Sequence, residues 1–165
     1  MSTPRSGLKL DVSAILARWI LAVVFIYMGA TKLLAPHKFL ELIQQYHLAN
    51  TPFLLNSIAA TLPWFEIFCG LLLLSGVGVR GTALVLVAML VPFTLAVANR
   101  ALQIASAKQL AFCAVKFDCG CGSGEVLICH KLVENSILIL LACWLLLGHG
   151  RQLAARFSLL PSPNA

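Results

Sequence analysis

Residues 12–34 read VSAILARWILAVVFIYMGATKLL, and Arg18 and Lys32 are the only charged residues in this stretch. A helix that crosses a membrane needs about 20 mostly apolar residues, because each residue rises about 1.5 Å through a hydrocarbon core about 30 Å thick. The stretch meets this requirement. We interpret it as a retained membrane helix rather than a cleaved signal peptide.

Three further segments have the same character, and we expect each to cross the bilayer: residues 56–77, 80–99 and 132–148. Pro92 in the third predicts a kink that neighbouring helices compensate. The short Gly-rich turn at residues 75–81 predicts that the second and third helices are antiparallel neighbours. The predicted fold class is therefore all-α, an integral membrane four-helix bundle that forms a single domain over residues 1–165.

The composition of the chain supports this interpretation. Of the 165 residues, 60% are hydrophobic and 11% are charged, whereas a soluble domain is about 45 to 50% apolar and about 25% charged. So few charges exclude a soluble enzyme, a disordered tail and a nucleic-acid-binding module. The net charge of +6 comes from basic residues scattered singly between apolar runs. Because equal numbers of them fall on the two sides of a four-span topology, the positive-inside rule does not decide the orientation.

Residues 36–47, between the first two spans, have the pattern of a short amphipathic helix. Phe39, Leu42, Ile43 and Tyr46 are spaced i, i+3, i+4 and i+7 and therefore share one helical face. We expect this helix to lie in the plane of the membrane interface.

Four of the six cysteines, Cys113, Cys119, Cys121 and Cys129, fall in the segment before the last span, which we call the cysteine loop (residues 113–129). Its centre reads DCGCGSG at residues 118–124. Glycines on both sides of Cys121 allow the backbone to turn sharply. A disulfide across a single residue closes a strained ring, and strain makes such a bond easier to reduce. This arrangement suits thiol–disulfide exchange.

Three interpretations of the cysteine loop remain open. Cys119 and Cys121 are an exchanging pair, with Cys113 or Cys129 as a resolving or relaying thiol; or the thiolates bind zinc or copper, although their spacing matches no common zinc pattern. In the third interpretation, two plain disulfides brace a loop that faces an oxidising compartment.

Glu66 lies inside the second span, where an ionised carboxylate costs several kcal/mol unless it has a partner. If the ends of the spans are aligned, Arg18 is offset from Glu66 by only about 6 Å along the bundle, and Lys32 is farther away. The alignment therefore predicts an Arg18–Glu66 ion pair. Such a pair either fixes the register of the two helices or forms a polar pocket in which Glu66 handles protons during quinone reduction or thiol chemistry.

The order of these motifs resembles the DoxX-like membrane proteins, and within them the branch of the methylamine utilisation protein MauE. The Cys119-Gly120-Cys121-Gly122 run is similar to the Cys-Gly-Cys element of that branch. The resemblance covers about residues 12–148. Its other matching residues are Arg18, Phe25, Gly29, Lys32, Phe39, Ile43, Tyr46, Pro52, Leu62, Pro63, Glu66, Gly70, Pro92, Phe93, Asn99 and Asn135.

The resemblance implies a multi-pass protein of the bacterial inner membrane with its cysteine loop in the periplasm. MauE is associated with maturation of methylamine dehydrogenase, whose small subunit carries many disulfides, alongside a thioredoxin-like periplasmic partner. Other DoxX-like proteins are linked to thiosulfate:quinone oxidoreduction.

Together these features predict a protein that passes reducing equivalents between a periplasmic thioredoxin-like partner and quinone in the lipid bilayer. Cys119 and Cys121 would exchange disulfides, Cys113 and Cys129 would form a second pair, and Arg18 and Glu66 would shape the cofactor site; the direction of electron flow stays open. The alternative is a non-enzymatic membrane scaffold, or a metal-delivery partner that uses the cysteine loop.

Overall fold

The computed structural model describes residues 5–46, 51–120 and 124–147, and for residues 5–12 it describes the backbone alone. In chain order the elements are α1 (Arg5–Leu34), α2 (Pro36–Gln45), α3 (Pro52–Ser75), α4 (Val79–Lys108), the 3-10 turn η1 (Phe112–Ala114), β1 (Lys116–Asp118), β2 (Glu125–Leu127) and α5 (Ile128–Leu146).

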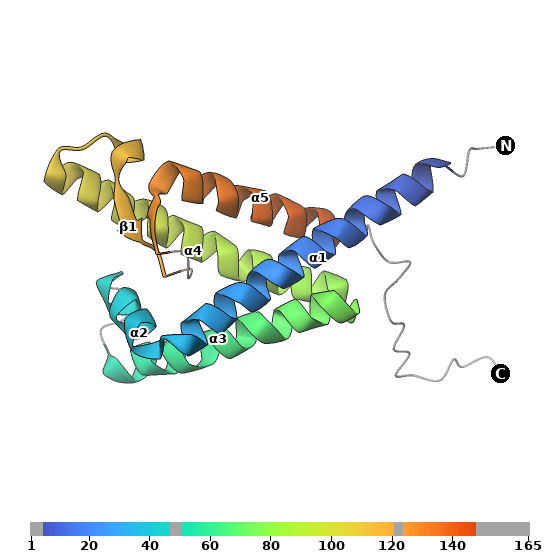
Figure 1. Ribbon diagram of the computed structural model, residues 1–165, viewed down its shortest axis with the longest axis horizontal. Helices are drawn as coiled ribbons and strands as arrows, with labels where there is room; N and C mark the ends of the chain where they lie inside the picture. Colours follow the sequence, from blue (N-terminus) through green and yellow to red (C-terminus); the bar gives the residue numbers. More distant parts are fainter. Residues whose placement is uncertain (1–4, 47–50, 121–123, 148–165) are drawn as a thin grey trace.

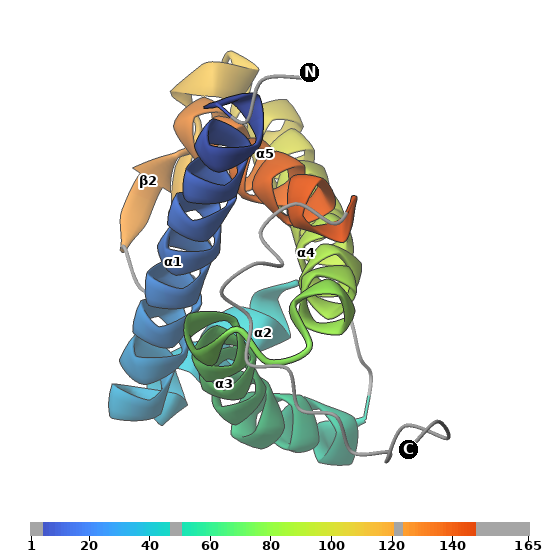
Figure 2. The same cartoon turned by 90° about the vertical axis from the view of Figure 1, so that its right-hand side faces the viewer.

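Within these residues, four helices are long and apolar enough to cross a membrane: Ser13–Leu34, Pro52–Ser75, Val79–Lys108 and Ile128–Leu146. This confirms the predicted all-α membrane bundle. α1 contacts α3 and α5, and α4 contacts the same two helices, so the four spans form a closed ring of neighbours. Figure 2 shows this ring from one end.

Helix ends follow the local sequence. Pro36 and Pro52 stand in the first turns of α2 and α3, where proline costs no helical hydrogen bond. α3 ends at Ser75 and is capped by Gly76, whose left-handed φ of 77° is favourable for glycine. The N–H of Val77 donates back to the carbonyl of Leu72 at 3.0 Å. The resulting tight turn makes α3 and α4 antiparallel neighbours, as predicted.

Two glycines allow α1 and α3 to pack closely. A Cβ atom at Gly29 would lie 2.6 Å from the carbonyl oxygen of Pro63, and one at Gly70 would lie 2.9 Å from the carbonyl oxygen of Ala22. Side chains at these positions would therefore push the helices apart. Small residues at a membrane helix interface permit such close backbone approach, and here they set the antiparallel register of the two helices.

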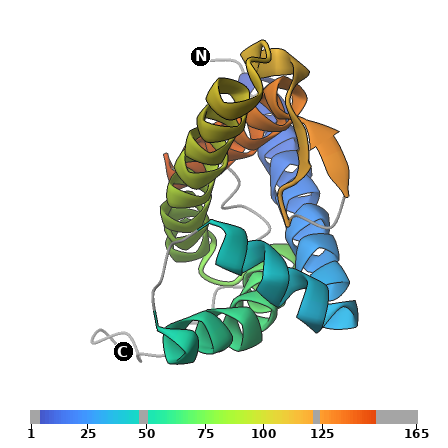
Figure 3. The ribbon, with the colours of Figure 1, turned by 90° about the vertical axis from the view of Figure 1, so that its left-hand side faces the viewer.

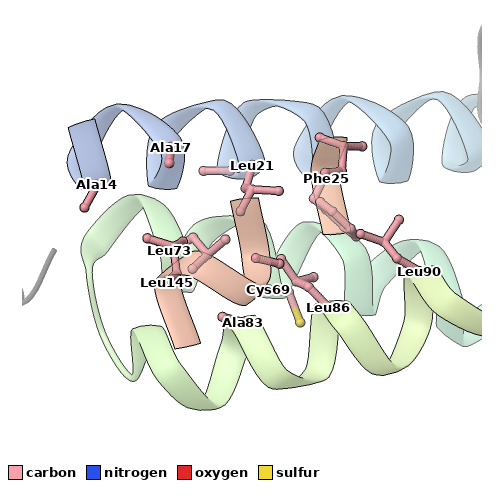
Figure 4. Close-up of a cluster of buried hydrophobic side chains, with 13 residues drawn as sticks. Ala14, Ala17, Leu21, Phe25, Cys69, Leu73, Ala83, Leu86, Leu90 and Leu145 are labelled. Atoms are coloured by element: carbon pink, nitrogen blue, oxygen red, sulfur yellow. The ribbon is translucent and has the colours of Figure 1, made fainter. Parts of the chain in front are cut away.

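The main hydrophobic core joins one row of α1 side chains to side chains from the other three spans. Figure 4 shows this row on one face of α1, directed toward α3, α4 and α5. Cys69 lies in the core as a free thiol, where a buried cysteine packs as a small apolar residue. The labelled members are Ala14, Ala17, Leu21 and Phe25 of α1, Cys69 and Leu73 of α3, Ala83, Leu86 and Leu90 of α4, and Leu145 of α5.

Large apolar side chains also cover the outside of every span. Trp19, Trp64, Leu95 and Leu140, one from each span, are all more than half exposed. A soluble protein rarely leaves such a continuous apolar exterior uncovered. The surface therefore fits a lipid bilayer.

The predicted ends of the spans differ from the structure most in α4, which was expected to stop at Asn99 and continues to Lys108. Arg100, the first charged residue after the predicted span, does not break the helix. Instead its guanidinium donates to the backbone carbonyl and the side-chain oxygen of Gln45 at the end of α2.

The cysteine loop contains a small hairpin that the sequence analysis did not predict. β1 and β2 pair antiparallel, with Phe117 opposite Val126. Figure 1 shows α2 and β1 at the same end of the bundle, away from the turn between α3 and α4. Figure 3, viewed from that end, shows α2 crossing in front of α3.

Candidate functional site, a cavity beneath the cysteine loop

A cavity of about 340 Å³ lies between α1, α2, α3, α4 and the cysteine loop. We call it the main cavity. Four groups with polar or redox chemistry line it, namely Lys32, Tyr46, Glu66 and Cys119. Most of the remaining wall is apolar and includes Phe25, Met28, Phe39, Leu62, Leu90 and Phe93.

Glu66 forms an ion pair with Lys32 across the interface of α1 and α3. Both side chains are only 5% exposed. Lys32 also lies over the ring of Phe39, with its Nζ 5.1 Å from the ring centre, a distance that allows a cation–π interaction. The pair therefore places one buried positive and one buried negative group against the main cavity.

The predicted Arg18–Glu66 pair was wrong, because the register of the helices differs from the assumed alignment of their ends. Gly29 packs against Pro63, so Glu66 is nearly level with Gly29 and one helical turn from Lys32. Arg18 lies about 16 Å farther back along α1. It is buried, does not line the main cavity, and its Nε and Nη1 make no hydrogen bond to the described part of the chain.

One oxygen of the Glu66 carboxylate still lacks a partner. Oε1 accepts the hydrogen bond from Lys32, whereas Oε2 is buried and has no hydrogen-bond donor among the described residues. A buried acceptor without a donor is costly. Because Glu66 lines the main cavity, a hydroxyl group of a bound ligand would satisfy Oε2.

Cys119 lies at the loop side of the main cavity and is 1% exposed. It is disulfide-bonded. Its backbone carbonyl accepts a hydrogen bond of 3.0 Å from the Tyr46 hydroxyl. The next residue, Gly120, has a left-handed φ of 79°, which agrees with the sharp turn expected beside the cysteines. Cys121 lies outside the described residues.

Asp118 fixes the same turn from the other side. Its Oδ1 accepts from the N–H of Gly120 at 3.0 Å, and its Oδ2 lies 3.3 Å from the Nζ of Lys38 on α2. Lys38 of α2 and Tyr46, the residue that caps this helix, therefore both bind the cysteine loop.

In the sequence, Tyr46 was noted as part of an apolar face and as a residue of the family resemblance, without a role of its own. Burial raises the pKa of its phenol, so the hydroxyl stays protonated and continues to donate to Cys119 at neutral pH. The guanidinium carbon of Arg100 lies 6.0 Å from the centre of its ring. The sequence signal for Tyr46 was its i+7 position on the apolar face of residues 36–47. This position predicts that the side chain is buried, but it does not identify the Cys119 carbonyl as its hydrogen-bond partner.

Cys113 and Cys129 form a disulfide that joins η1 to the start of α5. The second pair suggested by the sequence is therefore present. In the disulfide, neither sulfur is a thiolate that could bind a metal ion. Within the described ranges, no group of three His, Cys, Asp or Glu side chains is placed to bind a metal ion together.

A family profile described as methylamine utilisation protein MauE matches residues 10–148. The chain belongs to the MauE family. The match includes all four spans, the cysteine loop and every group that lines the main cavity. Among curated proteins and solved structures, none matches the chain.

Membership of the MauE family makes this a membrane protein linked to methylamine utilisation. For a MauE-family protein, the structure adds a specific arrangement of groups. One apolar cavity joins a disulfide-bonded cysteine to a buried Lys–Glu pair.

Proposed function

We propose that this MauE-family protein is a DoxX-like thiol–disulfide oxidoreductase of the bacterial inner membrane. It exchanges disulfides with a thioredoxin-like protein in the periplasm and passes the electrons to a quinone in the membrane. The observation that carries the proposal is that Cys119 and the Lys32–Glu66 pair line the same cavity. In this function the cysteine loop faces the periplasm.

The main cavity suits a quinone headgroup in size and chemistry. Its volume falls within the range of small-molecule sites, about 300 to 1,000 Å³, which are mostly apolar with a few polar groups. Lys32 can donate a hydrogen bond to a quinone carbonyl, and the free Oε2 of Glu66 can accept one from a quinol hydroxyl. Aromatic side chains from three helices, Phe25, Phe39 and Phe93, provide surfaces for the ring.

The proposed reaction begins at the disulfide of Cys119, with Cys121 as the proposed second sulfur. A thiolate of the partner attacks one of these sulfurs, breaks the loop disulfide and forms a mixed disulfide. The second thiol of the partner then displaces the loop sulfur, which leaves the partner oxidised and the loop as a dithiol. The dithiol gives two electrons to the quinone, which takes up two protons to become a quinol, and the loop disulfide forms again.

In this direction the protein supplies disulfides, which fits maturation of a disulfide-rich client such as a methylamine dehydrogenase-like enzyme. Cys113 and Cys129 lie in the same loop, and we propose them as a second pair that relays disulfides. The link of the family to methylamine utilisation supports this class of client.

Trapping of a mixed disulfide tests the proposal. With the partner supplied in its disulfide form, the free Cys119 thiol of a Cys121→Ala variant should attack that disulfide, the reverse of the forward step, and accumulate a covalent adduct that reductant releases. Cys119→Ala tests the reverse assignment. Cys143→Ala, which changes a free cysteine of α5, is the matched control and should trap nothing. If neither loop variant traps a partner while non-covalent co-purification persists, the protein is a scaffold and the proposal is wrong.

A further inference from the structure

A second, smaller pocket of about 120 Å³ shares Lys32 with the main cavity. We call it the outer pocket. Its polar side chains are Thr31, Lys32, Lys38 and Asp118, and two loop glycines, Gly120 and Gly124, complete this wall. Lys38 is 66% exposed. The outer pocket therefore adjoins water on the side of the cysteine loop.

Lys32 lines both the outer pocket and the main cavity. Glu66 lines only the main cavity and accepts a hydrogen bond from Lys32. The ion pair is thus the polar group that stands between a water-facing pocket and an apolar cavity. An ion pair that served only to fix helix register would not need access to either.

We propose that Lys32 and Glu66 are a proton-transfer pair that carries protons from water in the outer pocket to a quinone in the main cavity. This inference rests on the proposed function. For each quinone, two protons pass from the pair to the ring oxygens, and water in the outer pocket replaces each of them. The electrons come from the loop dithiol, whose two protons are released to water on the same side.

Among the described residues, the charged groups around the Lys32–Glu66 pair have partners of their own. Lys131 of α5 is a second buried cation, 1% exposed, and it pairs with Glu134 of the same helix at 3.0 Å. On the outer side the charged groups are Lys38 and Asp118, which pair with each other. Tyr46 also lines the main cavity, and its hydroxyl proton is donated to the carbonyl of Cys119.

A Lys32→Arg substitution separates proton transfer from charge pairing. Arginine keeps the positive charge and its pairing with Glu66, but it does not release a proton in proteins. We expect the purified variant in nanodiscs, with dithiothreitol as the dithiol and decylubiquinone as the acceptor, to form quinol at least tenfold more slowly. Reduction of the loop disulfide by dithiothreitol, measured separately by thiol labelling, should be unchanged.

Glu66→Gln should also slow quinol formation at least tenfold and flatten its pH profile, because an amide does not carry a proton. Glu134→Gln is the matched control, since Glu134 pairs with a buried lysine at 3.0 Å but lines neither pocket. Its rate and pH profile should equal those of the wild type. A wild-type rate in Lys32→Arg would overturn the proton-transfer pair and leave a register role.

The same assay distinguishes failure of the proposed function. If the wild type forms no quinol, or if Cys119→Ala forms it equally well, the oxidoreductase proposal itself is wrong. If the wild type is active, Cys119→Ala is inactive and Lys32→Arg is unaffected, only the proton pathway is wrong.

Wild-type vesicles give a second test that does not depend on the stability of variants. In vesicles with the cysteine loop outward, turnover with reduced thioredoxin outside should leave the pH of the lumen unchanged, because uptake and release occur on one side. A pH-sensitive dye trapped inside reports this. An alkaline shift of the lumen would show that protons come from the opposite side and would overturn the inference.

Discussion

Lys32 and Glu66 show why a buried charge is easier to identify in a sequence than its partner. Glu66 predicts that some cation lies near it, because an unpaired carboxylate is costly in hydrocarbon. Both Arg18 and Lys32 lie on the adjacent helix. The choice between them depends on a register that Gly29 and Gly70 set through backbone contact, and the alignment of span ends does not reveal such a contact.

At the scale of the residue, Tyr46→Phe tests the hydrogen bond that joins Tyr46 to the cysteine loop. Loss of the hydroxyl leaves the carbonyl of Cys119 without this donor, and a hydrogen bond contributes about 0.5 to 1.5 kcal/mol. We expect a lower unfolding temperature and faster reduction of the loop disulfide. Tyr27→Phe, on an exposed side chain of α1, is the control and should change neither quantity.

The raised pKa of Tyr46 makes the stability of the folded protein depend on pH, and the sign of this dependence can be predicted. Because burial holds the phenol neutral in the folded protein, ionisation above the ordinary tyrosine pKa of about 10 favours the unfolded state. The stability of the wild type should therefore fall above about pH 10, and that of Tyr46→Phe should fall less. Denaturation curves measured across this range check the prediction, and equal losses in the two proteins would contradict it.

At the scale of the element, the helices were predicted well and their ends were not. Apolar length identifies a span because it reflects transfer from water to lipid, but a helix can continue past the boundary, as α4 does to Lys108. The hairpin of β1 and β2 was missed because strands of three residues carry no detectable alternation. The amphipathic pattern predicted α2 correctly, since a single buried face is a local property.

The interface of α1 and α3 allows a sharp test with alanine. Gly29→Ala places a Cβ atom 2.6 Å from a backbone oxygen, and overpacking of this kind costs about 1 to 3 kcal/mol. The variant should be destabilised in detergent and should weaken the Lys32–Glu66 pair. Gly81→Ala in α4 meets nothing within 4 Å, so a loss of stability in this control of the same size would contradict the role of the interface.

The disulfide between Cys113 and Cys129 should stabilise the cysteine loop. It closes a loop with a sequence separation of 16, for which chain entropy predicts about 3 kcal/mol. The Cys113→Ser, Cys129→Ser double variant should unfold at lower temperature and lose protection of the hairpin from proteolysis. Cys143→Ser, at a free cysteine, should behave like the wild type.

At the scale of the whole molecule, several of the residues that carry the family resemblance line one cavity. Phe25, Lys32, Tyr46, Glu66 and Cys119 come from four separate segments of the chain, and all of them line the main cavity. The sequence analysis identified these residues singly. It did not predict the cavity, because a shared wall depends on how helices distant in sequence are arranged.

Brominated lipids test the predicted contact of the bundle with the bilayer. Trp19 and Trp64 are more than half exposed on the outside of α1 and α3, whereas Trp144 is partly buried on α5. Because bromine quenches indole fluorescence only at short range, single-tryptophan variants retaining Trp19 or Trp64 should be quenched more strongly than one retaining Trp144. Equal quenching of all three would contradict the lipid-facing arrangement.

The link between η1 and α5 has a consequence for biogenesis. Cys129 is made 16 residues after Cys113, so the bond closes only when the ribosome has passed the hairpin and the start of the final span. Closing the bond removes two electrons from the two thiols, so a new copy lacks this link until an oxidant has acted on it. Until then, η1 is not cross-linked to the start of the final span.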